Sequence, residues 1–138
     1  MKKYYSAYGS NLNLEQMKYR CPHAKKVGSY LLKDYELEFR YYLTIKKKKG
    51  AIVPVGIFEI DEVDERHLDS YEGFPKHYRK ETFNVELDGK PIEAIIYIMN
   101  EKIIGITPPS IDYFNVCLEG YKDFKFDDSY LFKAMEEC

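Results

Sequence analysis

Apolar and polar residues alternate along several stretches of this chain, and the alternation predicts β-strands. Residues 35–45 alternate for most of their length, whereas residues 51–60 are almost continuously apolar, which is typical of a strand buried on both faces. The dipeptide Asp88-Gly89 separates two further apolar stretches and is a strong hairpin signal. A turn is expected at Lys46–Gly50. The pattern predicts about six strands, at residues 3–8, 26–32, 35–45, 51–60, 77–87 and 91–99.

Helical spacing between these strands predicts about four short helices, each starting at a residue that can cap the free N–H groups. Gln16 stands three residues after the first cap in a capping-box arrangement, and Gly73 can end the second helix. The expected caps are Asn13, Asp61 or Asp64, Ser110, and Asp127 or Asp128. Strands and helices are mixed rather than strictly alternating. The pattern therefore predicts an α+β fold, a small mixed β-barrel or curled sheet with peripheral short helices.

Size and composition narrow the class of protein. The 138 residues suit a single domain, 1–138, and the 45% hydrophobic and 32% charged residues predict a folded, soluble chain. No apolar run approaches the roughly 18–20 residues of a membrane span. No long apolar segment follows the two lysines near the start, so a signal peptide is not expected either. We therefore expect a cytoplasmic protein.

The cysteines argue against a disulfide framework and against a metal site. Cys21, Cys117 and Cys138 are odd in number and form no CxxC pair, which indicates reduced thiols. Cys21 and His23 stand two positions apart, but nothing nearby completes a zinc tetrad. We expect neither a metal nor another cofactor.

The formal net charge of −2 hides an uneven distribution. Residues 1–50 carry 12 Lys and Arg against 4 Asp and Glu, whereas the rest of the chain is acidic. A basic first third suits an anionic ligand, and the acidic remainder argues against a general nucleic-acid binder. Lys46–Lys49, with Tyr41 and Tyr42 upstream as stacking partners, could still contact nucleic acid. A solvated hairpin tip that discourages edge aggregation is the better interpretation of these lysines.

Glu72 is the first candidate for chemistry, because it stands immediately before Gly73 at the expected end of a helix. A carboxylate is electrostatically misplaced there, since the C-terminal end of a helix carries partial negative charge. If the side chain also turns inward between Tyr71 and Phe74, desolvation adds to the dipole, and both raise its pKa. Such a carboxylate can act as a general acid and base near neutral pH. The alternative is a solvated glutamate on a frayed helix end.

The second candidate is the YGSNL stretch, Tyr8–Leu12. Gly9 lacks the Cβ that would block a close backbone approach, and Ser10 and Asn11 tolerate turn geometry and offer side-chain donors. If a helix begins at Asn13, its free N–H groups lie beside this loop, where a carboxylate or a developing oxyanion can be held. The alternative is an ordinary strand-to-helix turn.

Three segments, taken in order along nearly the whole chain, resemble the gamma-glutamylcyclotransferase (AIG2-like) family. The segment YSAYGSNL at Tyr5–Leu12 matches the family's Y-x-A-Y-G-S-N-L motif. In LDSYEG, the family's catalytic glutamate falls on Glu72, and the strand-opening tyrosine that follows falls on Tyr78. The segment PPSIDYFNVCLEGY resembles the family's Pro-Pro-Ser segment, whose substrate-contacting tyrosine falls on Tyr113.

The resemblance implies an enzyme in which the α-amine of a γ-glutamyl group attacks its own γ-carbonyl, releasing 5-oxoproline and a free amine. Glu72 would be the proton shuttle, and no metal, nucleotide or other cofactor would take part. The wall that selects the leaving amine would lie partly in residues 39–50 and 99–113. The residues implied to contact the substrate are Tyr5, Ala7, Tyr8, Gly9, Ser10, Asn11, Leu12, Tyr78 and Tyr113.

Two other classes of function stay open at this level. The same fold could serve as a non-catalytic module that binds a small ligand or a protein, although such a module has no need for a carboxylate at a helix end. A nucleic-acid-binding barrel resting on Lys46–Lys49 ranks below both, and it would bind with a steep salt dependence. We expect a small-molecule γ-glutamyl substrate, no nucleic-acid or membrane partner, and a monomer or weak homodimer.

Overall fold

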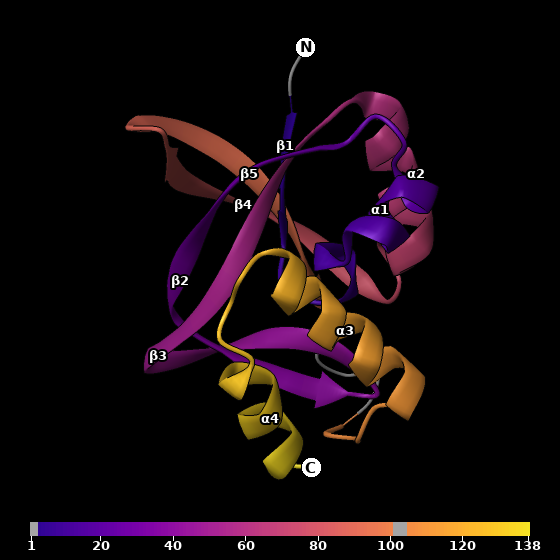
Figure 1. Cartoon of the computed structure of the whole chain (residues 1–138), viewed down its shortest axis with the longest axis vertical. Coiled ribbons are helices and arrows are strands. Elements are labelled where there is room, and N and C mark those ends of the chain that lie inside the picture. The colour runs from indigo at the N-terminus through magenta and orange to yellow at the C-terminus, as the bar shows by residue number, and fades with distance from the viewer. Residues whose placement is uncertain (1–2, 101–104) are drawn as a thin grey trace.

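The computed structural model describes residues 3–100 and 105–138, and these residues form a five-stranded sheet with four helices around it (Figure 1). The α+β class predicted from the sequence is confirmed. None of the described helices is both long enough and apolar enough to cross a membrane. The strands are β1 Lys3–Ala7, β2 Lys25–Arg40, β3 Tyr42–Ile60, β4 Tyr78–Leu87 and β5 Lys90–Met99. The helices are α1 Leu14–Arg20, α2 Glu62–Glu72, α3 Ile111–Asp123 and α4 Ser129–Glu136, and a 3-10 turn, η1 Ser10–Leu12, joins β1 to α1.

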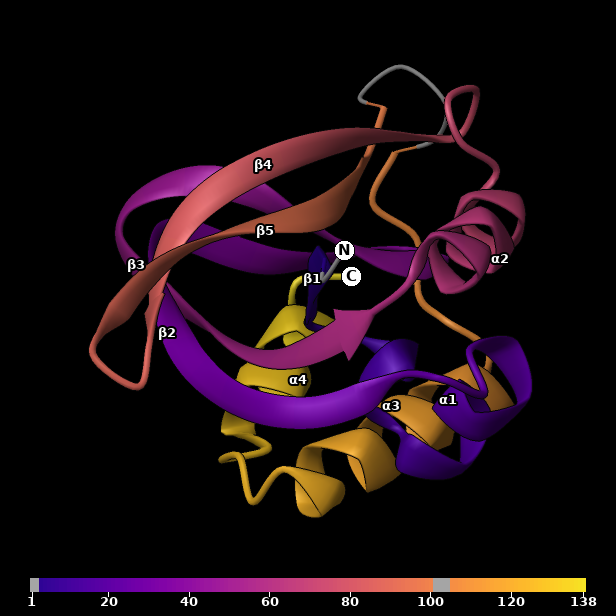
Figure 2. The same ribbon diagram turned by 90° about the horizontal axis from the view of Figure 1, so that it is seen from above.

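The sheet is mixed and curled. Its strand order is β2-β3-β1-β5-β4, and the central strand β1 runs antiparallel to β3 and parallel to β5. The edge strands β2 and β4 do not pair with each other in the described residues, so the curled-sheet alternative is confirmed and the closed barrel is wrong. The strands curve strongly, and the tip of the β4–β5 hairpin lies at the end of the molecule opposite α1 and α2 (Figure 2).

The turn between β2 and β3 lies at Tyr41, so the predicted turn at Lys46–Gly50 is wrong and those residues lie inside β3. Tyr41 adopts a left-handed backbone conformation with φ of 65°. Thr107 holds this turn through two backbone hydrogen bonds, in one of which its carbonyl accepts the Tyr41 N–H at 2.9 Å. Asp34, which the sequence placed between two strands, instead stands at a bulge in one long strand.

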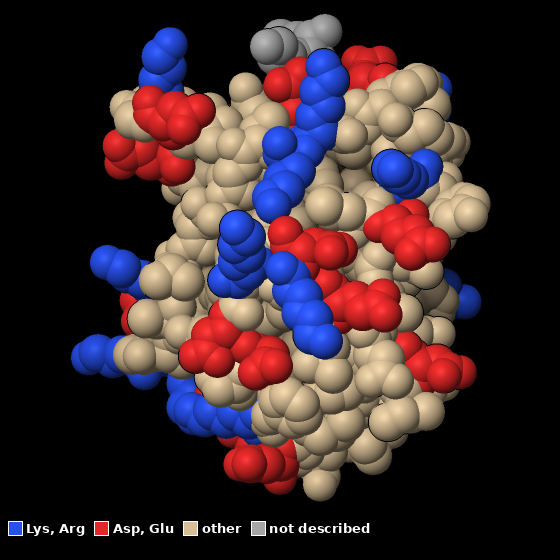
Figure 3. Space-filling view, viewed as in Figure 1, with Lys and Arg blue, Asp and Glu red and all other residues tan. Residues whose placement is uncertain are grey.

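Two of the four lysines at 46–49 pair with acidic residues of β2, and the four lie within β3 rather than at a hairpin tip. The Nζ of Lys46 lies 2.8 Å from the carboxylate of Glu38, and the Nζ of Lys48 lies 3.0 Å from that of Glu36. Cross-strand pairs of opposite charge stabilise neighbouring strands and reduce the charge left for a polyanion. Basic and acidic side chains are also intermingled on the face shown in Figure 3.

Most of the other local predictions are confirmed, although the side chain of Asp128, one of the two caps expected for the last helix, accepts no N–H of α4. Gly73 ends α2 with φ of 67°, and Asp88 and Gly89 both have positive φ, as a tight two-residue hairpin turn requires. Side chains accept a backbone N–H at the start of α1, α2 and α3, namely those of Asn13, Asp61 and Ser110.

The core is built from the sheet together with the helices and is rich in aromatic residues. Phe39, Phe58, Tyr97 and Tyr121 are at most 2% exposed, and burial of each such side chain contributes roughly 1.5–3 kcal/mol. Gly56 of β3 allows the end of α3 to approach, since a Cβ there would stand 2.4 Å from the ring of Phe124. This packing brings α3 against the segment that follows β1.

Candidate active site

A cavity of about 550 Å³ lies where several distant parts of the chain meet. Its walls come from β1 and the loop after it, the β2–β3 turn, the C-terminal end of α2, β4 and β5, and the start of α3. A volume of this size suits a small molecule. Both candidates from the sequence, Glu72 and the loop of residues 9–11, line this one cavity.

Glu72 is the last residue of α2, and its half-buried side chain faces the cavity. Burial, one of the two causes expected from the sequence, raises the pKa of Glu72 from the ordinary 4.5 to about 7, and the nearby Arg20 cation partly opposes the rise. No described residue donates a hydrogen bond to the Glu72 carboxylate, and the last turn of α2 contains no basic residue. A carboxyl group in this state can accept a proton and return it near neutral pH.

The loop of residues 9–11 offers backbone donors beside the same cavity. The N–H groups of Gly9, Ser10 and Asn11 make no hydrogen bond to any described residue, although Ser10 and Asn11 are buried. The N–H of Leu12, by contrast, donates to the carbonyl of Gly9 at 3.0 Å. Buried N–H groups without a partner are rare, and a group of them can bind an anion.

Ala7 and Leu12 are the exceptions among the residues that the motif singled out. Their side chains are 1% and 0% exposed, lie in the core and do not line the cavity. Motif spacing does not distinguish a side chain that faces the core from one that faces the cavity, which explains the difference. The remaining residues of the expected set do line the cavity, namely Tyr5, Tyr8, Gly9, Ser10, Asn11, Tyr78 and Tyr113.

Two of these tyrosines hold the turn between β2 and β3 in place. The hydroxyl of Tyr78 donates to the carbonyl of Leu43 at 3.0 Å, and the hydroxyl of Tyr113 accepts the N–H of Leu43 at 3.1 Å. Burial raises the pKa of Tyr113 well above its ordinary value of 10, so the phenol stays neutral. The backbone of Leu43 is thereby fixed at the cavity wall.

Tyr5 is positioned by the loop residue Asn11. Its hydroxyl accepts a hydrogen bond from the Asn11 side-chain amide at 2.9 Å, and no described residue accepts the proton of this hydroxyl. The hydroxyl of Tyr8, by contrast, donates to the carbonyl of Tyr97 at 2.6 Å. Burial raises the pKa of Tyr5 well above 10, so Tyr5 presents a neutral O–H donor to the cavity.

Arg20 and Tyr71 also belong to this site, although the sequence did not mark them as site residues. The guanidinium carbon of Arg20 lies 3.6 Å from the centre of the Tyr71 ring, and the guanidinium also donates to the side-chain carbonyl of Asn11. Tyr71 lines the cavity, and its hydroxyl lies 3.2 Å from the Oγ of Ser10. Arg20 and Tyr71 are far apart in the sequence, so no local pattern brings them together. Within α1, Gln16 stands four residues before Arg20, and its side-chain carbonyl accepts a second hydrogen bond from the guanidinium at 3.1 Å. This spacing was the local indication of a contact made by Arg20.

The wall expected from residues 39–50 and 99–113 is present in part. Residues 40–43 and Met99 line the cavity, while residues 101–104 lie outside the described part of the chain. His77, just before β4, also lines the cavity and had no signal in the sequence.

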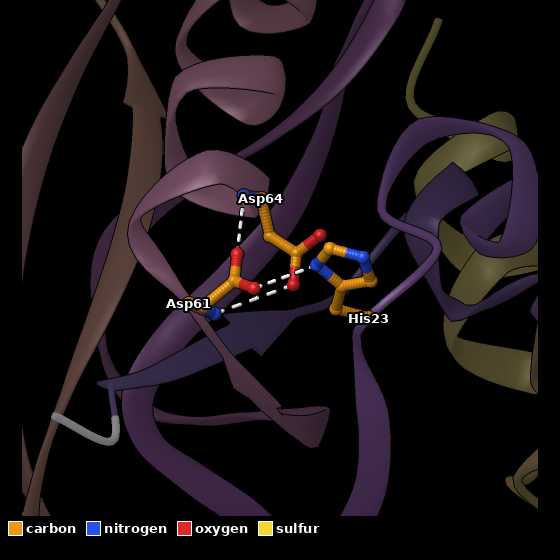
Figure 4. A group of neighbouring side chains, drawn as sticks. All are labelled: His23, Asp61 and Asp64. Carbon is orange, nitrogen blue, oxygen red and sulfur yellow. Dashed lines mark hydrogen bonds and ion pairs between the residues drawn. The ribbon is translucent and has the colours of Figure 1, made fainter.

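A group that could hold a cation lies at the other end of α2, formed by His23, Asp61 and Asp64 (Figure 4). One potential ligand atom from each residue lies within 4.8 Å of the others. Their present contacts are those of a helix cap, because Asp61 accepts the N–H of Asp64 at 2.8 Å and Asp64 accepts that of Asp61 at 3.3 Å. The Nδ1 of His23 lies 2.7 Å from Asp61. These contacts explain the cluster as part of the N-terminal cap of α2, remote from Glu72.

Comparison with known proteins agrees with the motif pattern. A solved structure described as "Gamma-glutamyl cyclotransferase" superimposes with a TM-score of 0.83 at 25% identity, over 97% of this chain and 86% of that one. An uncharacterized protein from Homo sapiens gives a TM-score of 0.84 at 26% identity, over 96% and 86% of the two chains. The "Putative gamma-glutamylcyclotransferase" of Methanocaldococcus jannaschii is 40% identical over 70 residues, 50% of this chain and 58% of that relative, so the match spans little more than half of it.

The fold and the cavity define a protein with a curled mixed sheet, in which a carboxylate and backbone N–H groups that have no partner in the described part of the chain share one small-molecule cavity. Residues 5–114 match the model of the family described as "Gamma-glutamyl cyclotransferase, AIG2-like". The chain belongs to this family.

Proposed function

We propose that this protein is a γ-glutamyl cyclotransferase, which converts a γ-glutamyl compound into 5-oxoproline and a free amine. Family membership supports a small-molecule γ-glutamyl substrate. One observation carries the proposal: the Glu72 carboxyl group, with a pKa of about 7, shares a cavity with the N–H groups of residues 9–11, and neither has a hydrogen-bond partner among the described residues. A proton acceptor facing a group of anion-binding donors is what this reaction needs.

The reaction begins when the α-ammonium group of the substrate loses a proton, because the protonated nitrogen cannot attack. Glu72 accepts this proton as the general base. The amine then attacks the γ-carbonyl carbon of the same molecule, and a new C–N bond closes the five-membered ring. Since nucleophile and electrophile are already tethered, the cavity has only to fold the γ-glutamyl chain into a near-attack conformer.

Ring closure places negative charge on the former carbonyl oxygen. The N–H groups of Gly9, Ser10 and Asn11 stabilise either this oxyanion or the α-carboxylate of the substrate. The intermediate collapses when the bond between the carbonyl carbon and the leaving nitrogen breaks. Two protons leave the attacking nitrogen during the reaction, and the leaving nitrogen gains two if it departs as an ammonium group. Glu72 carries these protons in turn, which a carboxyl group with a pKa near neutrality can do.

The decisive experiment measures 5-oxoproline release from a panel of γ-glutamyl compounds by wild type and by Glu72→Gln. The amide keeps the shape of the side chain but cannot shuttle a proton, so we expect kcat to fall by about 100- to 10,000-fold while the substrate still binds. Glu62→Gln, an exposed change on the same helix, is the matched control and should keep wild-type activity. Wild-type turnover in Glu72→Gln would contradict the proposed role of Glu72.

The panel also separates the proposal from a binding module. Calorimetric titration of the same compounds would reveal binding without turnover if the protein is such a module. Release of 5-oxoproline by wild type and not by Glu72→Gln supports the enzyme. Binding of a compound that wild type never cleaves supports the module.

A further inference from the structure

Arg20 lies between the two halves of the site and contacts both of them. It is the last residue of α1, and it is not among the residues that line the cavity. Its guanidinium reaches the loop on one side and α2 on the other, through Asn11 and Tyr71. A planar guanidinium suits such a place, because its fork of donors and its flat face can be used at the same time.

The contact with Asn11 sets the direction in which the Asn11 amide points. Its carbonyl oxygen accepts from Arg20, so its NH₂ group is turned to the hydroxyl of Tyr5, to which it donates at 2.9 Å. Without Arg20, the buried carbonyl oxygen of Asn11 would lose its donor, and the amide could rotate away from Tyr5.

The contact with Tyr71 fixes the end of α2. The guanidinium carbon lies 3.6 Å from the ring centre, within the range of a cation–π interaction. The Tyr71 hydroxyl lies 3.2 Å from the Oγ of Ser10, so the ring is held from two sides. Tyr71 directly precedes Glu72, and the backbone that carries the proposed proton shuttle is therefore tied to the loop through Arg20.

We infer that Arg20 is a positioning residue of the active site, which holds the loop of residues 9–11 and the Glu72 end of α2 at a fixed separation without touching the substrate. The inference rests on the proposed function for its catalytic meaning, and on the contacts above for its geometry.

The charge of Arg20 has a second effect on the same site. A nearby cation favours the ionised form of Glu72 and so lowers its pKa against the rise caused by burial. Arg20 is the charged group that acts on Glu72 most directly. The other titratable or charged groups that share the cavity wall with Glu72 among the described residues are Tyr5, Tyr8, Arg40, Tyr41, Tyr42, Tyr71, His77, Tyr78, Tyr97 and Tyr113.

Two substitutions separate the positioning role from the charge. Arg20→Lys keeps the charge but cannot bond Asn11 and Gln16 and stack on Tyr71 together, whereas Arg20→Met loses both. Lys18→Met, an exposed change in the last turn of the same helix, is the matched control. The measurement is the pH profile of kcat/KM for 5-oxoproline release, with circular dichroism to establish that each variant is folded.

We expect both Arg20 variants to lose about 10- to 100-fold in kcat/KM, as small displacements in an active site do, while Lys18→Met keeps wild-type activity. In Arg20→Met the acid limb of the profile should also move to higher pH, and in Arg20→Lys it should stay near the wild-type position. Wild-type kcat/KM in Arg20→Lys would overturn the positioning role. If Arg20→Met does not fold, the Arg20→Lys result decides by the same criterion.

A second readout needs no turnover and so distinguishes failure of this inference from failure of the proposed function. In NMR spectra of the wild type, the side-chain NH₂ protons of Asn11 should exchange slowly with solvent, because both ends of the amide are bonded. They should exchange faster in both Arg20 variants and not in Lys18→Met. Unchanged exchange would overturn the inference whether or not 5-oxoproline is formed.

Discussion

Gly120 of α3 lies directly against the backbone of Asn13, and a Cβ at position 120 would stand 2.6 Å from the Asn13 nitrogen. The same Cβ would stand 2.8 Å from the carbonyl carbon of Leu12. Helix α3 therefore packs against Leu12 and Asn13, directly after the loop of residues 9–11, at a distance that only glycine allows.

We expect Gly120→Ala to push this loop towards the cavity. The methyl group meets backbone rather than the end of a flexible side chain, so we expect a loss of about 1–3 kcal/mol in the free energy of unfolding. Activity should fall as well, because the backbone donors move. Urea unfolding and 5-oxoproline release measure the two effects. Asn115→Ala, an exposed change on α3, is the control and should be neutral or slightly stabilising. A Gly120→Ala variant as stable and active as wild type would contradict the close contact.

The pKa of Glu72 predicts the pH dependence of turnover. Glu72 accepts a proton only when its carboxyl group is ionised. With a pKa of about 7, this group is ionised in half of the molecules near pH 7. We expect kcat/KM to fall about tenfold for each pH unit below that point, because each unit lowers the ionised fraction tenfold. A profile measured from pH 5 to pH 9 tests this. An acid limb near pH 4.5, the ordinary value for a glutamate, would mean that burial does not act on Glu72 as described.

Glu72 should also make the protein less stable at neutral and alkaline pH. Its pKa is about 7 in the folded protein and 4.5 in the unfolded chain, so the folded state binds more protons between these values. Stability therefore falls as pH rises from 4.5 to 7, and the cost is absent below 4.5. We expect Glu72→Gln to be more stable than wild type by at most about 3 kcal/mol at pH 8, with a smaller difference at pH 5. Thermal unfolding of both proteins at the two pH values checks this, and Glu62→Gln should show no such trend.

The hydroxyl of Tyr5 is predicted to matter more for turnover than for stability. It accepts the Asn11 amide at 2.9 Å and presents its own proton to the cavity, so Tyr5→Phe removes a donor from the site. We expect kcat/KM to fall about 10- to 100-fold, with a stability loss of about 1 kcal/mol. Tyr30→Phe is the matched control, because its hydroxyl lies 2.9 Å from the Oγ of Ser6 and is not part of the cavity. An equal loss of activity in Tyr5→Phe and Tyr30→Phe would mean that the loss comes from a disturbed fold and not from the missing donor in the site, which would contradict the prediction.

Short-range signals in the sequence predicted the ends of most elements correctly. Asn13, Asp61 and Ser110 cap their helices, and Asp88 with Gly89 makes the hairpin turn, as expected. Capping and tight turns depend on groups within three or four residues, so the local sequence contains the information.

The turn between β2 and β3 could not be predicted in this way. In the local sequence, Lys46 and Lys48 are typical of a turn. In the sheet, however, they pair with the acidic side chains of Glu36 and Glu38. The actual turn at Tyr41 is held by Thr107, a residue from a distant segment. Strand pairing is a contact between remote parts of the chain, and a pattern within one part does not reveal it.

By itself, the sequence determined which groups carry the proposed chemistry, because the position of Glu72 at a helix end and of Gly9 in a tight loop is a local property. Only the tertiary structure decided that these two groups share a cavity, that Ala7 and Leu12 face the core, and that Arg20 joins the loop to α2. The reason is physical. Burial and the separation of charges depend on how remote segments pack, and these two quantities set the pKa of Glu72.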